Sequence, residues 1–338
     1  MAENNKSSPS IALEFAQRIK LQYRRDKITQ LSPVIILIGL IIFFSFISPN
    51  FFTLDNFLNI LGQIAIPLVL ALGLTFVVLT GSIDLSIDGT MALTGTVVGF
   101  LVRNNQNTWN LGIGGILITV LIGGLFGFLI GIIYVKMRIP SFMVSFGMAN
   151  ITRGIAASIN GTLPASIKDE AFRGMALNQF IGIPYITWIA LGLFLLAYII
   201  QERTAFGRHL FAVGANEKIP KMTGINVNKV KINAFVWSGL CIGLAGVIGA
   251  SRLGLGTILI GSNNLFPTLT AVVAGGTLFS GGKGGVLNTL FGVLIVTVLN
   301  VGLILWGVKP EVQRGIQGII IVIAVSLSVM HSRKLISK

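Results

Sequence analysis

Apolar runs of about 20 residues recur along the chain between short polar segments, and a helix needs that length to cross a hydrocarbon core of roughly 30 Å. The expected spans are residues 33–48, 57–80, 86–102, 111–135, 140–158, 185–201, 232–252, 266–280, 286–306 and 311–330. This pattern predicts an all-α polytopic membrane protein with about ten transmembrane helices.

The composition excludes several other classes of protein. Of the 338 residues, 53% are hydrophobic and 11% are charged, whereas a soluble domain carries roughly 25% charged residues. Such a chain cannot cover a globular core with polar surface, and it is too apolar to be disordered. An outer-membrane barrel would need segments of about 10 residues that alternate between apolar and polar, and a run such as residues 33–48 does not alternate.

The net charge of +14 is explained by where the basic residues fall between the expected spans. With the N-terminus in the cytoplasm, eighteen Lys and Arg residues lie in cytoplasmic segments and five lie outside, namely Arg103, Lys168, Arg173, Arg252 and Lys309. Cytoplasmic loops of membrane proteins carry an excess of Lys and Arg. We therefore expect both termini in the cytoplasm and no nucleic-acid partner.

Three regions are expected along the chain. Residues 1–32 are a basic cytoplasmic leader without the features of a cleavable signal, either a short amphipathic helix on the inner leaflet or a solvated tail. Residues 33–332 form the transmembrane domain, which includes a long basic cytoplasmic loop at 202–231. Residues 333–338 form a basic cytoplasmic tail.

The first polar segment inside the apolar sequence is 80–89, where one span ends and the next begins. Two carboxylates, Asp84 and Asp88, lie there between apolar stretches, and ionisable groups at such depth usually face protein, water or a permeation path. Alternatively, an Asp or Ser of this segment caps the following helix. The residues expected to line a path are Ser82, Asp84, Asp88, Asn150 and Arg153.

The second segment is the basic cytoplasmic loop between Arg203 and Lys231. Asn216 is suited to cap a short helix that begins at Glu217, and Gly224 is suited to the left-handed position that ends it. The helix either packs on loops of its own chain or contacts a cytoplasmic partner. The residues expected to act in such a contact are Gly214, Asn216, Glu217, Thr223 and Gly224.

The third segment is rich in glycine and runs from Ala274 to Gly285. It resembles a phosphate-binding loop in composition, but it lacks that motif because Gly284 follows Lys283. Glycines in such number after a short span are typical of a tight turn or a broken helix beside a cavity. The glycines expected to form it are Gly275, Gly276, Gly281, Gly282 and Gly284.

Together these segments resemble the membrane subunits of bacterial sugar ABC importers, the ribose, galactose and xylose permeases. The resemblance lies in residues 81–86 (GSIDLS), 203–208 (RTAFGR), 212–217 (AVGANE) and 275–284, and it extends from about Ser48 to the C-terminus. It implies a type II importer-like fold of ten helices in the bacterial inner membrane. It also implies three partners: a second permease copy, identical or paralogous, a cytoplasmic ATP-binding subunit and an extracytoplasmic substrate-binding protein. In that family, the helix at 216–224 would dock on the ATP-binding subunit.

The chain departs from the family pattern at several positions. Residues 265–271 are LFPTLTA, whereas these permeases usually have Glu-Leu-Asp-Ala-Ile-Ala-Ala there. Asp88, Ser82 and Ala215 each stand where the family usually has Gly. The expected substrate is therefore a small sugar or a related polar solute, and its identity is left open.

The sequence contains no Walker motif, metal-ligand cluster or Ser-His-Asp arrangement, and its two histidines, His209 and His331, lie in cytoplasmic segments. We therefore expect neither an enzyme nor a bound metal or cofactor, and ATP hydrolysis is expected in a partner. An ion-coupled secondary transporter is the alternative, with Asp84 or Asp88 as the coupling carboxylate. A membrane-embedded enzyme would need more ionisable groups at one depth; Arg153 and Arg314 are the other charges within expected spans.

Overall fold

The computed structural model describes residues 31–161, 163–309, 311–313, 315–316, 318–319 and 322. Its helices are Leu31–Ile47, α2 (Leu54–Gln63), α3 (Ala65–Leu79), α4 (Ile87–Leu101), α5 (Gly112–Met137), α6 (Ser141–Asn160), α7 (Glu170–Leu177), α8 (Tyr185–Arg203), α9 (Ala205–Ala215), α10 (Lys218–Met222), α11 (Val227–Leu253), the 3-10 helix η1 (Ile258–Gly261), α12 (Leu265–Ala274) and α13 (Val286–Leu305). Two short antiparallel ladders pair β1 (Ala165–Ser166) with β4 (Leu255–Gly256) and β2 (Gln179–Phe180) with β3 (Ile183–Pro184).

Several expectations fall on residues outside this description. They are the leader through residue 30, the tail 333–338, most of the span 311–330, Arg314 and His331.

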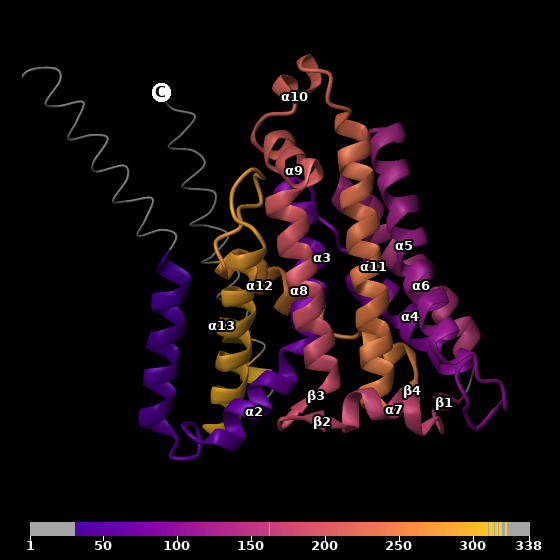
Figure 1. Ribbon diagram of the computed structural model, residues 1–338, viewed down its shortest axis with the longest axis vertical. Coiled ribbons are helices and arrows are strands. Elements are labelled where there is room, and N and C mark those ends of the chain that lie inside the picture. The colour runs from indigo at the N-terminus through magenta and orange to yellow at the C-terminus, as the bar shows by residue number, and fades with distance from the viewer. Residues whose placement is uncertain are drawn as a thin grey trace, which may run out of the picture.

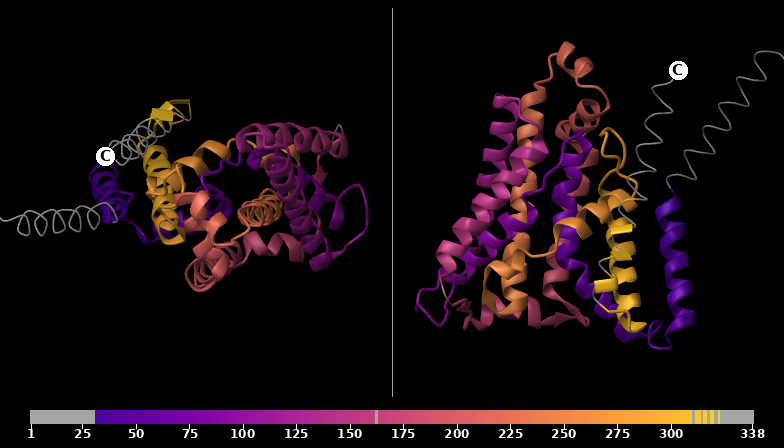
Figure 2. Two further views of the ribbon diagram at one scale, coloured as in Figure 1. Left: turned by 90° about the horizontal axis from the view of Figure 1, so that it is seen from above. Right: turned by 180° about the vertical axis from the view of Figure 1, so that it is seen from behind.

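The long helices run side by side, with α9 and α10 at one end of the molecule and α7 with the short strands at the other (Figure 1). Helix α11 lies in the centre, where it contacts α5, α3 and α4 (Figure 2). Small residues allow its closest contact, because a Cβ added to Gly127 of α5 would lie 2.2 Å from the carbonyl oxygen of Phe235. Such close backbone packing is typical of helices in membranes, where small residues replace the hydrophobic driving force.

The helical, membrane-spanning character expected from the sequence is confirmed in coarser form. In the described part of the chain, α5, α8, α11 and α13 are long and apolar enough to cross a bilayer, and the bent pair α2 and α3 makes a fifth candidate. The helix Leu31–Ile47, α4 and the region Ile258–Ala274 are apolar but shorter. Helix α6 has 20 residues and a more polar composition.

Two expected spans differ in detail from the structure. The span 57–80 is not one helix, because α2 and α3 are bent by 43° at Ile64. The span 266–280 is also too long, because α12 ends at Ala274 and residues 275–285 form turns. The glycine-rich composition of 275–285 explains that second difference, since five of its glycines adopt positive φ angles between 72° and 144°.

Candidate functional site

A non-helical segment, residues 80–86, separates α3 from α4 within apolar surroundings. Its side chains alternate in burial, with Ser82 and Asp84 buried and Ile83 and Leu85 half-buried on the other side. Backbone N–H groups in such surroundings need partners inside the protein. The N–H groups of Ile83 and Leu85 donate to the hydroxyls of two α6 serines one turn apart, Ser141 at 3.0 Å and Ser145 at 2.9 Å.

Asp84, a residue of segment 80–86, is buried against α11. Its Oδ1 atom accepts a hydrogen bond from the backbone N–H of Ser86 at 2.9 Å, and its Oδ2 atom accepts one from the hydroxyl of Ser238 at 2.8 Å. The neighbouring Ser82 hydroxyl lies 3.1 Å from the hydroxyl of Tyr134 in α5. Both side chains therefore face the interior of this chain. Ser86 makes no side-chain capping bond at the start of α4.

Asp88 caps a helix other than its own. Its Oδ1 atom accepts hydrogen bonds from the backbone N–H groups of Asn264 at 3.1 Å and Leu265 at 2.9 Å, where α12 begins. Asn263 has a left-handed φ of 64° and Asn264 is right-handed, and successive N–H groups in that arrangement form an anion-binding concavity. The expectation that an Asp or Ser of this segment caps the following helix, α4, is therefore wrong in its target, because Asp88 caps α12 instead.

Asn150 and Arg153 lie on the exposed face of α6. The Asn150 amide donates to the carbonyl oxygen of Phe146 in its own helix at 2.9 Å, and Arg153 attracts the Asp88 carboxylate electrostatically. The five expected path residues therefore do not form one cluster. Ser82 and Asp84 are buried, Asp88 is half-buried, and Asn150 and Arg153 are exposed.

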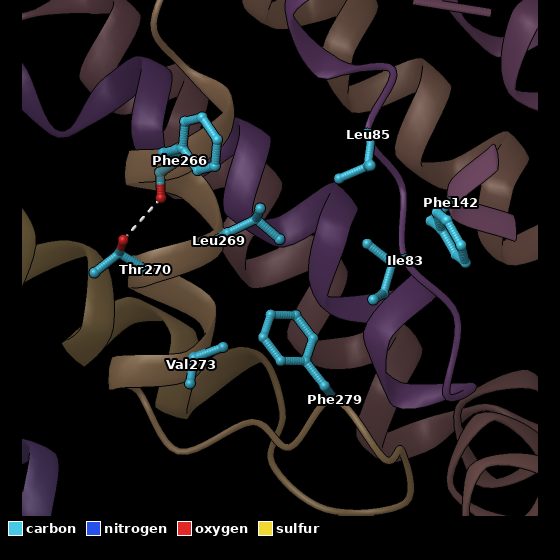
Figure 3. A pocket seen from close by; sticks show the side chains of 8 residues that line it. All are labelled: Ile83, Leu85, Phe142, Phe266, Leu269, Thr270, Val273 and Phe279. Carbon is cyan, nitrogen blue, oxygen red and sulfur yellow. Dashed lines mark hydrogen bonds between the residues drawn. The ribbon is translucent and has the colours of Figure 1, made fainter. Parts of the chain in front are cut away.

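A cavity of about 320 Å³ opens beside segment 80–86. Ile83, Leu85 and Phe142 lie opposite Phe266, Leu269 and Val273 across it, and Thr270 and Phe279 complete its lining (Figure 3). The Thr270 hydroxyl donates to the carbonyl oxygen of Phe266 at 2.8 Å, which leaves an almost wholly apolar wall. Sequence reasoning missed these aromatic residues, although Phe266 lies in the segment 265–271 that departs from the sugar permeases.

The glycine-rich segment after α12 forms the expected tight turns. Gly276, Gly281, Gly282 and Gly284 all have left-handed φ angles. Gly275 instead allows α12 to approach α13, because a Cβ there would lie 2.2 Å from the carbonyl oxygen of Asn288. These glycines thus have two different roles, the turn and the helix contact.

The cytoplasmic loop expected at 202–231 contains two helices, and the sequence analysis missed α9. A local signal for it exists, because Thr204 caps α9 by accepting a hydrogen bond from the N–H of Gly207 at 3.2 Å. The expected short helix is present as α10, one residue later than predicted. The Asn216 side chain accepts a hydrogen bond from the N–H of Lys218 at 3.0 Å, and Gly224 follows the helix with a left-handed φ of 83°.

Gly214, near the end of α9, touches the end of α3 and the loop after α12, each of which leads into one side of the cavity. A Cβ added to it would lie 1.8 Å from the carbonyl oxygen of Leu79 and 2.5 Å from the backbone nitrogen of Gly282. A Cβ on Gly281 would in turn lie 2.7 Å from the backbone nitrogen of Gly81 and 2.9 Å from the Cα atom of Gly214. We call these five residues, Leu79, Gly81, Gly214, Gly281 and Gly282, the glycine junction.

The other residues expected in a partner contact, Asn216, Glu217, Thr223 and Gly224, are all exposed. Glu217 also forms an ion pair with Lys231 at the start of α11. Two apolar side chains of α10 are also exposed, Ile219 by 62% and Met222 by 87%. Sequence reasoning did not single out these two residues.

The opposite end of the molecule carries a group of basic side chains. The N–H of Lys168 donates to the carbonyl oxygen of Arg103 at 2.9 Å, and the Arg173 guanidinium packs against Gly254, close in sequence to Arg252. Lys168 and Arg173 line a cavity of about 330 Å³ together with Glu170 of α7. Four of the five basic residues expected outside the membrane are thus in one region.

Comparison with known proteins identifies relatives along most of the chain. A family model described as branched-chain amino acid transport system / permease component matches residues 56–325. The ribose import permease protein RbsC of Escherichia coli (strain K12) is 34% identical over 296 residues, which are 86% of this chain and 91% of that protein. RbsC of Haemophilus influenzae is 36% identical over 86% of this chain and 90% of its own length.

The galactose/methyl galactoside import permease protein MglC of Escherichia coli (strain K12) is 31% identical, over 89% of this chain and 94% of that protein. No solved structure matches the chain. The resemblance to sugar import permeases drawn from the polar segments is therefore confirmed, and with its apolar helices the chain is a multi-pass protein of the bacterial inner membrane. The chain belongs to the permease-component family that its model match describes, among relatives that are ribose and galactose import permeases.

Proposed function

We propose that the chain is the permease subunit of an ATP-driven importer for a small sugar or a related polar solute. A cytoplasmic ATP-binding subunit hydrolyses ATP, and an extracytoplasmic binding protein delivers the solute. Support for the sugar comes from the relatives, which include ribose and galactose import permeases. The permease itself performs no chemistry. Its gates open or close because the ATP-binding subunit and the binding protein each bind one gate state more tightly than the other.

The observation that most supports this proposal is the glycine junction. It joins the end of α9 to Leu79 and Gly81, where segment 80–86 begins, and to Gly281 and Gly282 after α12. Segment 80–86 and α12 are also the two walls of the cavity. A displacement of the cytoplasmic helices would therefore reach both walls through direct backbone contact.

The exposed apolar residues of α10 support a cytoplasmic partner. Helix α10, which carries the exposed Ile219 and Met222, lies at the tip of the molecule beyond the long helices (Figure 1). Exposed apolar side chains gathered outside the membrane typically mark a protein contact. We therefore assign α10, with Asn216, Glu217, Thr223 and Gly224 around it, to the surface that docks on the ATP-binding subunit.

The translocation path is proposed to be the cavity between segment 80–86 and α12, completed by a second permease copy on the exposed face of α6. Phe142 and Phe266 offer aromatic faces to a sugar ring, and Asn150 and Arg153 are exposed on α6, the helix that carries Phe142. Few polar groups line the cavity itself. Weak contact suits a solute that a binding protein delivers, because tight binding would slow its release.

The ten-span topology with both termini in the cytoplasm is part of the proposal. It is supported by the positions of α10 and α7 at opposite ends of the molecule (Figure 1). On this topology the basic group around Lys168 and Arg173 faces outward, where it would attract acidic side chains of the binding protein.

The proposal is tested on the chain purified with its ATP-binding subunit. The double variant Ile219→Ser/Met222→Ser should lose co-purification of that subunit and ATP-driven uptake of radiolabelled ribose or galactose, while the chain stays folded. Exposed Lys168→Ala, at the other end, serves as the control for assembly. Full assembly and uptake by the serine variant would refute the docking surface, and a wild-type chain that never binds an ATP-binding subunit would refute the importer.

The buried carboxylate of Asp84 keeps an ion-coupled secondary transporter as a second candidate. Both of its oxygens already accept hydrogen bonds, from Ser86 and Ser238, which favours a structural role. Uptake driven by a proton or sodium gradient in vesicles that hold this chain alone would establish that second function.

A further inference from the structure

A continuous set of polar contacts joins α10 to segment 80–86 by a route separate from the glycine junction. Glu217, directly before α10, forms an ion pair with Lys231 of α11. The Lys231 ammonium lies 5.1 Å from the ring centre of Tyr134 in α5. The Tyr134 hydroxyl lies 3.1 Å from the Ser82 hydroxyl, and Thr80 donates to Ser82 at 3.2 Å.

Each of these contacts is sheltered from solvent at one side at least. Lys231 and Ser82 are buried, Tyr134 is half-buried, and only Glu217 is exposed. A buried ammonium needs a counter-charge, because leaving either partner of such a pair unpaired is strongly destabilising. The position of Lys231 is therefore tied to Glu217 on one side and to the face of the Tyr134 ring on the other.

Resting on the proposed function, we propose that Lys231 and Tyr134 are positioning residues that transmit the movement of α10 to segment 80–86. When the ATP-binding subunit shifts α10, Glu217 draws Lys231 with it. The Lys231 ammonium then shifts the Tyr134 ring, and the Tyr134 hydroxyl shifts Ser82. Ile83, the next residue, forms part of the cavity wall, so the wall changes with the state of the partner.

The test compares variants that differ by one hydroxyl. Tyr134→Phe keeps the ring beneath Lys231 and removes the hydroxyl that contacts Ser82, whereas Tyr198→Phe makes the same change in α8, where the ring stacks on Phe194. Each is combined with Ile83→Cys in a Cys241→Ser background, and the transporter is assembled with its ATP-binding subunit. The measurement is the rate of maleimide labelling at residue 83 with and without a non-hydrolysable ATP analogue.

In the otherwise unchanged background, the analogue should change the labelling rate at Ile83→Cys. Tyr134→Phe should reduce that change by roughly 2- to 12-fold, the range that the loss of one neutral hydrogen bond corresponds to, and Tyr198→Phe should preserve it. Ser82→Ala removes the same contact from the other end and should match Tyr134→Phe. A normal response in both Tyr134→Phe and Ser82→Ala would overturn the inference, as would a failure of both variants to assemble.

A double-mutant cycle separates a connected network from independent effects. If Glu217 acts through Lys231 and Tyr134, Glu217→Gln combined with Tyr134→Phe should be no worse than the stronger single variant. Simple addition of the two effects would refute the connection. The proposed function fails differently, because a wild-type chain that does not assemble with the ATP-binding subunit would give no labelling response in any background.

Discussion

The backbone N–H of Gly282 donates a hydrogen bond to the carbonyl oxygen of Leu79 at 3.0 Å, which fastens the loop after α12 to the end of α3. Gly214 of α9 packs against the same two residues. These contacts bring together the end of α3, the end of α9 and the loop after α12, which are more than sixty residues apart in the sequence. Helix α9 meets there the end of α3 and the loop after α12, which lead into the two walls of the cavity, so we expect substitutions at this point to affect stability and transport together.

Gly214→Ala should destabilise the protein, because the added methyl would lie 1.8 Å from the Leu79 carbonyl oxygen and the backbone would have to shift. Overpacking of this kind costs typically about 1 to 3 kcal/mol. The thermal unfolding midpoint in detergent measures the effect. Gly192→Ala in α8 is the matched control, since nothing lies within 4 Å of its added Cβ. Equal midpoints for the two variants would contradict the tight contact.

Asp84→Ala should leave the N–H of Ser86 and the hydroxyl of Ser238 without their acceptor, at a cost of about 1 to 3 kcal/mol in unfolding free energy. Asp84→Asn keeps an acceptor oxygen and should cost less. The unfolding free energy of both variants is measured by titration with a denaturing detergent, with Asp55→Ala at an exposed position as the control. In a double-mutant cycle, Ser238→Ala should cost little once Asp84 is gone; a full additive cost would show that the two side chains act independently.

Asp88→Ala should release the start of α12, because Asp88 accepts the N–H groups of Asn264 and Leu265. Hydrogen exchange of the peptide around residues 263–268 should become faster, by about tenfold for each 1.4 kcal/mol of lost protection. Asp88→Asn keeps the accepting oxygen and should lie between wild type and alanine. Unchanged exchange in the alanine variant would mean that α12 does not depend on this cap.

The topology is tested with single cysteines in a Cys241→Ser background. Met222→Cys, which replaces the exposed side chain in α10, should react only with reagents that reach the cytoplasm. Leu163→Cys, near the basic group at the other end, should react only with reagents outside the cell. The reason is that eighteen Lys and Arg residues lie in the expected cytoplasmic segments and only five lie in the expected outside segments. Labelling of both from the same side would exclude the ten-span arrangement.

The features that the sequence predicted correctly depend on neighbours in the chain. The apolar runs predict helices because a backbone in lipid must satisfy its own hydrogen bonds. The tight turns at Gly276 and Gly281 and the left-handed Gly224 follow from a residue that tolerates positive φ.

The features that the sequence left open depend on which distant segments meet. Asp88 caps a helix that starts 177 residues later, at Leu265, so a local pattern could only assign the carboxylate to its own helix. The same holds for the ion pair between Glu217 and Lys231 of α11. It also holds for the aromatic wall that Phe142 and Phe266 form from two different helices. By itself the sequence determined a helical membrane protein with three special segments, since periodicity and glycine content are local properties. Only tertiary packing decided that these segments converge, because the contacts between Gly214, Leu79 and Gly282 exist only once α3, α9 and the loop after α12 lie against one another.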